Sequence, residues 1–146
     1  MFFLERNRKR EQKSEYVTAI IFNVIFWYIV NNILNWHIYF ITNAFSEVLW
    51  ILNLTIIVTI IGNVLLLFYS PEKFRHVMKI ILNIFAFIAV YFVYEVFPFN
   101  FYNSFYNWGV TILLILAMIG IVIATIVEIY LLLSGKPRLI RNKTGD

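Results

Sequence analysis

Apolar residues dominate four long stretches of the chain, and short polar segments separate them. A helix needs about 20 mostly apolar residues to cross a bilayer core, whereas the strands of a membrane barrel show about ten residues of alternating polarity. The stretches are too long and too continuously apolar for such strands. The pattern therefore predicts four membrane-spanning helices, at about 16–36, 47–69, 73–97 and 108–133.

The composition agrees with this pattern. Of the 146 residues, 62% are hydrophobic and 14% are charged, against about 25% charged residues in a typical soluble domain. We therefore expect an all-α membrane protein, folded as a four-transmembrane-helix bundle. Its single domain is predicted over 16–134, between basic tails at 1–15 and 135–146.

Positive charge is confined to alternate connections between the predicted helices. The 12 Lys and Arg residues all lie in the two tails and around the second connection, whereas the first and third connections have none. Cytoplasmic segments of membrane proteins carry the excess of Lys and Arg. Both termini are therefore predicted to be cytoplasmic, in a multi-pass protein of the plasma (inner) membrane. The basic tails are expected to contact anionic inner-leaflet lipids rather than nucleic acid.

Two prolines mark predicted helix boundaries. Ser70, Pro71 and Glu72 have the pattern of a helix start, with Ser as N-cap, Pro at the first helical position and an acid in the first turn. Pro98 predicts the end of the third span on the outer side.

Polar residues within the spans are the candidates for function, because a polar group in lipid is costly. One such group has a member on each helix at similar depth toward the cytoplasm: Asn23, Asn63, Asn83 and Glu128. We expect these residues to form a polar layer in which the amides hydrogen-bond the carboxylate. The layer is either a structural cross-link, with Glu128 at the interface or paired with Lys79 or Lys136, or a proton- or cation-linked site.

A second polar group lies toward the outer side of the predicted bundle. It contains Asn31, Asn32, Asn35, Asn53, Glu47 and Glu95. These residues either cap helix ends and solvate the interface or form an outward-facing site for a cation or substrate.

Small residues follow one narrow stripe of the fourth span. Ala117, Gly120 and Ala124 are spaced by three and four residues, and Glu128 continues the stripe. Small residues at this spacing allow another helix to approach closely, so we expect helix packing here.

Familiar catalytic and cofactor-binding patterns are missing from the sequence. Cysteine is absent, and His37 and His76 are predicted on opposite sides of the membrane, so neither a thiol site nor a histidine metal or haem site is expected. The sequence also has no glycine-rich phosphate loop. We therefore expect no enzyme activity, no cofactor and no bound metal.

Four short runs of the chain form a recognisable set: Val30-Asn31-Asn32, Leu52-Asn53-Leu54, the run 63–69, and Val96-Phe97-Pro98-Phe99. Together they resemble a group of uncharacterised prokaryotic four-helix integral membrane proteins of unknown function. The similarity covers about 17–133, and the chain departs from it at Ser70 and Asn100, where the group would have an acid. The resemblance implies the four-helix topology and implies no activity.

The sequence favours a small, non-enzymatic accessory or assembly component of the membrane, whose partner is another membrane protein or a second copy of the chain. The alternative is a small oligomeric transporter or channel that uses the predicted Glu/Asn layer. Four helices leave little room for a pathway within one chain, so transport would require an oligomer.

Overall fold

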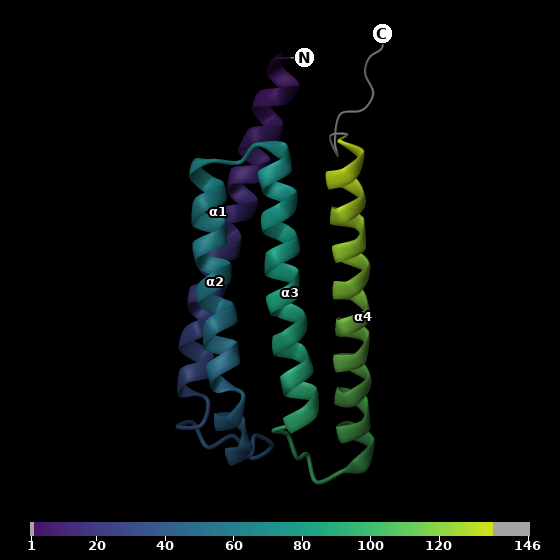
Figure 1. Cartoon of the computed structure of the whole chain (residues 1–146). Helices are drawn as coiled ribbons and strands as arrows, with labels where there is room; N and C mark the ends of the chain where they lie inside the picture. The colour runs from purple at the N-terminus through teal and green to yellow at the C-terminus, as the bar shows by residue number, and fades with distance from the viewer. Residues whose placement is uncertain (1, 136–146) are drawn as a thin grey trace.

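The computed structural model describes residues 2–135, which form four long helices that run alternately up and down (Figure 1). The helices are α1 (Phe2–Asn32), α2 (Leu49–Phe68), α3 (Glu72–Val96) and α4 (Ser104–Ser134), and a short 3-10 helix, η1 (Asn43–Glu47), precedes α2. Each of the four long helices is long and apolar enough to cross a membrane. The predicted all-helical class is confirmed for the described residues, which contain four long apolar helices as predicted.

Several predicted boundaries differ from the structure. Helix α1 begins at Phe2, so it includes most of the predicted N-terminal tail, and it ends before 33–36, which form a turn. The predicted C-terminal tail lies outside the described residues, apart from Gly135.

The predicted start of α3 was wrong by one position. Pro71 is the N-cap, with an extended backbone (φ −64°, ψ 157°), and no side chain caps the helix. Helix α3 therefore begins at Glu72, and Ser70 lies too early to act as its cap. At the other end the prediction is confirmed: Phe97 adopts a left-handed conformation (φ 46°) and ends the helix just before Pro98.

We call the end of the molecule where α1 begins, α4 ends and α2 turns into α3 the terminal end, and the opposite end the loop end (Figure 1). The connections at the loop end bond to each other. The Thr42 N–H donates to the Pro98 carbonyl (3.0 Å), and the Asn100 N–H donates to the Phe40 carbonyl (2.8 Å). The rings of Phe40 and Phe101 stack with centroids 4.7 Å apart. These contacts hold the two aromatic loops together.

The largest cluster of buried apolar residues lies where α1, η1, α2 and α3 meet, whereas Tyr16 and Leu66 are buried nearer the terminal end. The cluster consists of Val30, Phe45, Val48, Ile51, Ile56 and Ala89. Helix α4 contributes none of them. Among the described residues, the only buried residue of α4 is Glu128.

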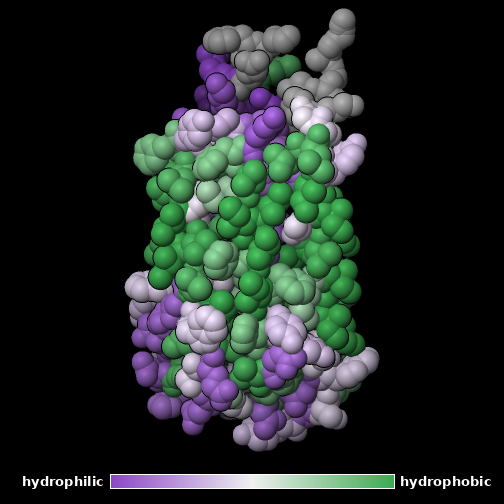
Figure 2. All heavy atoms as spheres, viewed as in Figure 1, coloured by the Kyte–Doolittle hydropathy of each residue, from purple (hydrophilic) through white to green (hydrophobic). Residues whose placement is uncertain are grey.

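Close approaches of the helix backbones join only consecutive helices among the described residues, so α4 packs against α3 alone. Gly62 allows α2 and α3 to approach closely, because a Cβ atom at this position would lie 3.1 Å from the Met78 sulfur and 3.2 Å from a Leu82 methyl group. The visible face agrees with a membrane location, since hydrophobic residues cover its middle and hydrophilic residues lie toward both ends (Figure 2).

Candidate functional site: a buried histidine between two carboxylates

Four charged or titratable side chains share one face of α3 at the terminal end. Glu72, Arg75, His76 and Lys79 are spaced by three, one and three residues, so they lie on neighbouring turns. One Glu72 oxygen lies 2.7 Å from an Arg75 guanidinium nitrogen, and the other lies 3.1 Å from His76 Nε2. Glu72 therefore binds both of its neighbours, one with each carboxylate oxygen.

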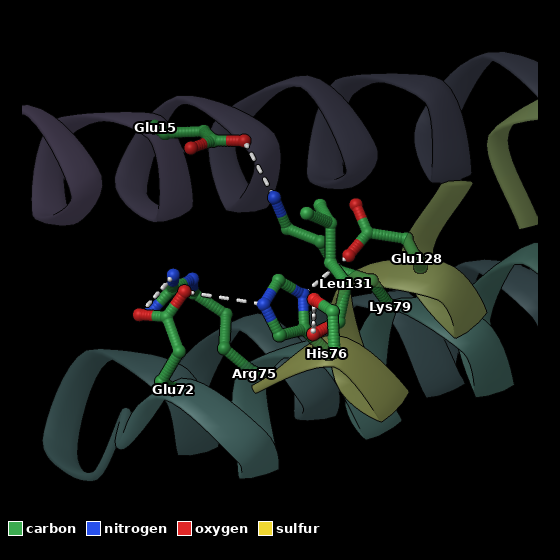
Figure 3. A network of polar contacts seen from close by, with 8 residues as sticks. Glu15, Glu72, Arg75, His76, Lys79, Glu128 and Leu131 are labelled. Carbon is green, nitrogen blue, oxygen red and sulfur yellow. Dashed lines mark hydrogen bonds and ion pairs between the residues drawn. The ribbon is translucent and has the colours of Figure 1, made fainter. Parts of the chain in front are cut away.

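The second ring nitrogen of His76 reaches across to α4. His76 Nδ1 lies 2.6 Å from Glu128 Oε1, and only 2% of His76 and 5% of Glu128 are exposed. Figure 3 shows the imidazole between Glu72 on one side and Glu128 on the other. His76 thus links the start of α3 to the end of α4 through a buried contact.

The geometry restricts the protonation of this cluster. An ionised carboxylate only accepts hydrogen bonds, so an imidazole that bonds two ionised carboxylates must carry a proton on both nitrogens. With Arg75 included, the cluster then has two negative and two positive groups. If the ring is neutral, one of the two carboxyl groups must be protonated to keep both bonds. In each case the cluster holds one more proton than a neutral imidazole between two ionised carboxylates would hold.

A cavity of about 260 Å³ lies beside this cluster, and all four helices line it. Its lining includes Tyr16 from α1, Asn63 from α2, Asn83 from α3 and Glu128 from α4. The hydroxyl group of Tyr16 is buried and has no hydrogen-bond partner among the described residues. At the rim, Lys79 Nζ lies 3.6 Å from a Glu15 oxygen, which connects α3 to α1 (Figure 3).

The structure brings together three of the four residues of the predicted inner layer. Asn63, Asn83 and Glu128 line the same cavity, whereas Asn23 is not in its lining. The amide groups of Asn23 and Asn63 donate to carbonyls of their own helices, those of Ala19 and Thr59, both at 2.8 Å. The partner that binds Glu128 at 2.6 Å is His76, which the predicted layer did not include. Lys136, the other predicted partner, lies outside the described residues.

The predicted outer group does not form one site. Asn31 and Asn53 form a double hydrogen bond between α1 and α2, with Nδ2-to-Oδ1 distances of 2.7 and 3.1 Å. Asn32 donates to the Tyr28 carbonyl of its own helix. The other members, Asn35, Glu47 and Glu95, are exposed.

The stripe of small residues on α4 is exposed in the structure. Ala117, Gly120 and Ala124 are all exposed, and a Cβ atom on Gly120 would meet nothing within 4 Å. Gly120 therefore makes no close helix contact within the described residues, whereas Ala124 lines the cavity of about 260 Å³. The role of the stripe in helix packing stays a prediction, for a contact with another molecule.

The sequence prediction missed the contribution of His76 and Arg75, because Arg75 was counted among the cations around the second connection and His76 was assigned only to one side of the membrane. The available signal was the run of charged and titratable residues on one face at the start of α3, on a helix whose other residues are almost all apolar. A face with Glu, Arg, His and Lys on successive turns needs polar partners wherever another helix packs on it. Tyr16 had no comparable signal, because tyrosine at a span end is ordinary in an aromatic belt.

No cluster of His, Cys, Asp or Glu with metal-binding geometry occurs among the residues that the structure describes. No family model, no curated protein and no solved structure matches the chain. The resemblance to four-helix membrane proteins therefore stays a prediction, and the site must be interpreted from its geometry.

Proposed function

We propose that this protein is a non-enzymatic assembly component of the plasma (inner) membrane, with both termini in the cytoplasm. The cations of α1 and α3 lie at the terminal end, which supports this orientation. In this proposal the protein acts by presenting α4 to a partner within the membrane, either another membrane protein or a second copy of the chain.

The observation that carries the proposal is the attachment of α4. The residue that α4 buries is Glu128, held by His76, and large apolar side chains such as Leu116 and Ile123 are more than half exposed. A helix attached in this way offers most of its circumference to lipid or to another helix. The exposed small residues around Gly120 are of the kind that permits close helix approach. The buried contact between His76 and Glu128 then fixes the orientation of this surface.

Crosslinking in native membranes tests this function. A photoreactive residue at Leu116 should give one discrete protein adduct, and the same residue at Phe22, which is also more than half exposed and lies on α1, should give mainly lipid adducts. Glu128→Gln should reduce the adduct at Leu116 because α4 loses its ionic attachment. Glu47→Gln is the matched control, since Glu47 is exposed at the loop end. Lipid adducts alone at Leu116 would overturn the proposal.

A second candidate function is transport of a small polar solute or cation by an oligomer. The observation that favours it is the cavity of about 260 Å³, which has polar lining residues from all four helices. Purified protein in proteoliposomes would then give a flux that Glu128→Gln abolishes and Glu47→Gln leaves intact. The assembly proposal expects no such flux from either form.

A further inference from the structure

A second cavity lies at the terminal end, between the first turns of α1 and the α2–α3 turn, and it has a volume of about 560 Å³. Three cations of α1 line it, Arg8, Lys9 and Lys13, together with the side chains of Phe68 and Tyr69 from the turn. We propose that this cavity binds the phosphate of an anionic phospholipid headgroup.

The charge of the lining suits an anion. Glu72 is the one acid among the lining residues, and the Arg75 guanidinium at 2.7 Å and His76 at 3.1 Å already bind it. The three cations of α1 therefore give the cavity an excess of positive charge. Basic pockets between helices at the cytoplasmic side of a membrane are suited to anionic headgroups.

One polar atom of a residue that lines this cavity needs a partner. The Nε atom of Arg8 is buried and has no hydrogen-bond partner among the described residues. A buried guanidinium N–H without an acceptor is costly. The planar guanidinium of Arg can donate two parallel hydrogen bonds to two oxygens of one phosphate. A phosphate bound here would satisfy this N–H.

The apolar part of the lining favours a lipid over free phosphate. Phe68 and Tyr69 are 85% and 65% exposed, and they lie where the last turn of α2 gives way to the charged start of α3. A lipid can place its phosphate among the cations and its acyl chains along these rings, whereas inorganic phosphate would leave the rings uncovered. The assignment to a lipid rests on the proposed membrane location of the chain. It does not depend on the proposed assembly partner.

Native mass spectrometry of the purified full-length protein tests the assignment. The protein in detergent is mixed with phosphatidylglycerol or phosphatidylcholine that carry identical acyl chains. Phosphatidylglycerol should bind about tenfold more tightly, because phosphatidylcholine carries the same phosphate together with a cationic choline group that the three α1 cations repel. Arg8→Gln should remove most of this preference. Arg10→Gln should keep it, because Arg10 is an exposed cation of the same helix outside the cavity lining.

Three results would overturn the proposal: equal binding of the two lipids, equal losses in the Arg8 and Arg10 variants, or displacement of the lipid by inorganic phosphate at millimolar concentration. The last result would assign the cavity to free phosphate. If Arg8→Gln fails to fold, as judged by tryptophan fluorescence, Lys13→Gln takes its place, since Lys13 lines the cavity and is exposed. The experiment needs no partner protein, so its failure is distinct from failure of the crosslinking test.

Discussion

Two polar contacts between helices lie at opposite ends of the molecule and differ in chemistry. Near the loop end, Asn31 and Asn53 exchange two neutral hydrogen bonds between α1 and α2. At the terminal end, His76 and Glu128 join α3 to α4 through a short contact between titratable groups. The amide pair is partly exposed, whereas the histidine and the glutamate are buried.

The surroundings of the two contacts explain why their expected energies differ. Helices α1 and α2 also share buried apolar residues, such as Val30 and Ile51, so their amide pair is one contact among several. The residue that α4 buries is Glu128 itself. The two contacts therefore differ in how many fully buried apolar residues accompany them, and variants at both ends can test the consequence of this difference.

Removal of one partner of the buried pair should have the largest effect. We expect Glu128→Ala to lower the free energy of unfolding by about 3–5 kcal/mol, because it leaves His76 buried beside an empty site. Denaturation in mixed micelles, followed by tryptophan fluorescence, measures the change. The double variant His76→Leu with Glu128→Leu is the control and should recover most of the loss, since a well-packed apolar pair can replace a buried ionic one. A loss below about 1 kcal/mol in the single variant would contradict the importance of the contact.

The tightest approach between helices should give the next largest effect. Gly62→Leu should destabilise the protein by about 1–3 kcal/mol, because Met78 and Leu82 already lie within 3.1–3.4 Å of the position of a Cβ atom. Gly120→Leu is the matched control and should change the free energy of unfolding by less than about 0.5 kcal/mol, since nothing lies within 4 Å. The same denaturation assay compares the two variants. Equal losses would mean that both glycines lie in helix contacts.

These contacts show which parts of the structure the sequence could predict. The four helices follow from the length and apolar character of the stretches, because a bilayer core demands about 20 apolar residues. The depth of Glu128, Asn63 and Asn83 follows from counting residues along each helix, and these three do line one cavity. Depth along a helix is a local property, so one sequence is enough to estimate it.

The partner of Glu128 could not be predicted in the same way. The direction of each side chain around its helix depends on which helices pack together, and α4 packs on α3 alone rather than in a closed ring. This arrangement turns Glu128 toward His76 and leaves Gly120 exposed. The sequence assigned His76 only to one side of the membrane, whereas the structure buries it against α4. Contacts between helices are nonlocal, and a hydrophobic pattern alone does not determine them.

The amide pair at the loop end should contribute less than the buried ionic pair. A double-mutant cycle of Asn31→Ala and Asn53→Ala should give a coupling energy of about 0.6 kcal/mol, and at most about 1.7 kcal/mol, as found for polar contacts between membrane helices. Unfolding in mixed micelles measures all four forms. A coupling energy as large as the loss in Glu128→Ala would contradict the comparison, because the two ends would then be equally dependent on polar contacts.

The contact between Glu15 and Lys79 should have the smallest effect. Its atoms are 3.6 Å apart, and the side chains are 59% and 23% exposed. Exposed ion pairs contribute about 0.2–1 kcal/mol, and solvent screening places this pair at the lower end. Glu15→Gln should therefore lower the free energy of unfolding by about 0.2 kcal/mol, and less still in 0.5 M salt. This pair joins α1 to α3 at the cavity rim. A loss above about 1 kcal/mol would mean that α1, like α4, depends on a strong polar contact with α3 at the terminal end.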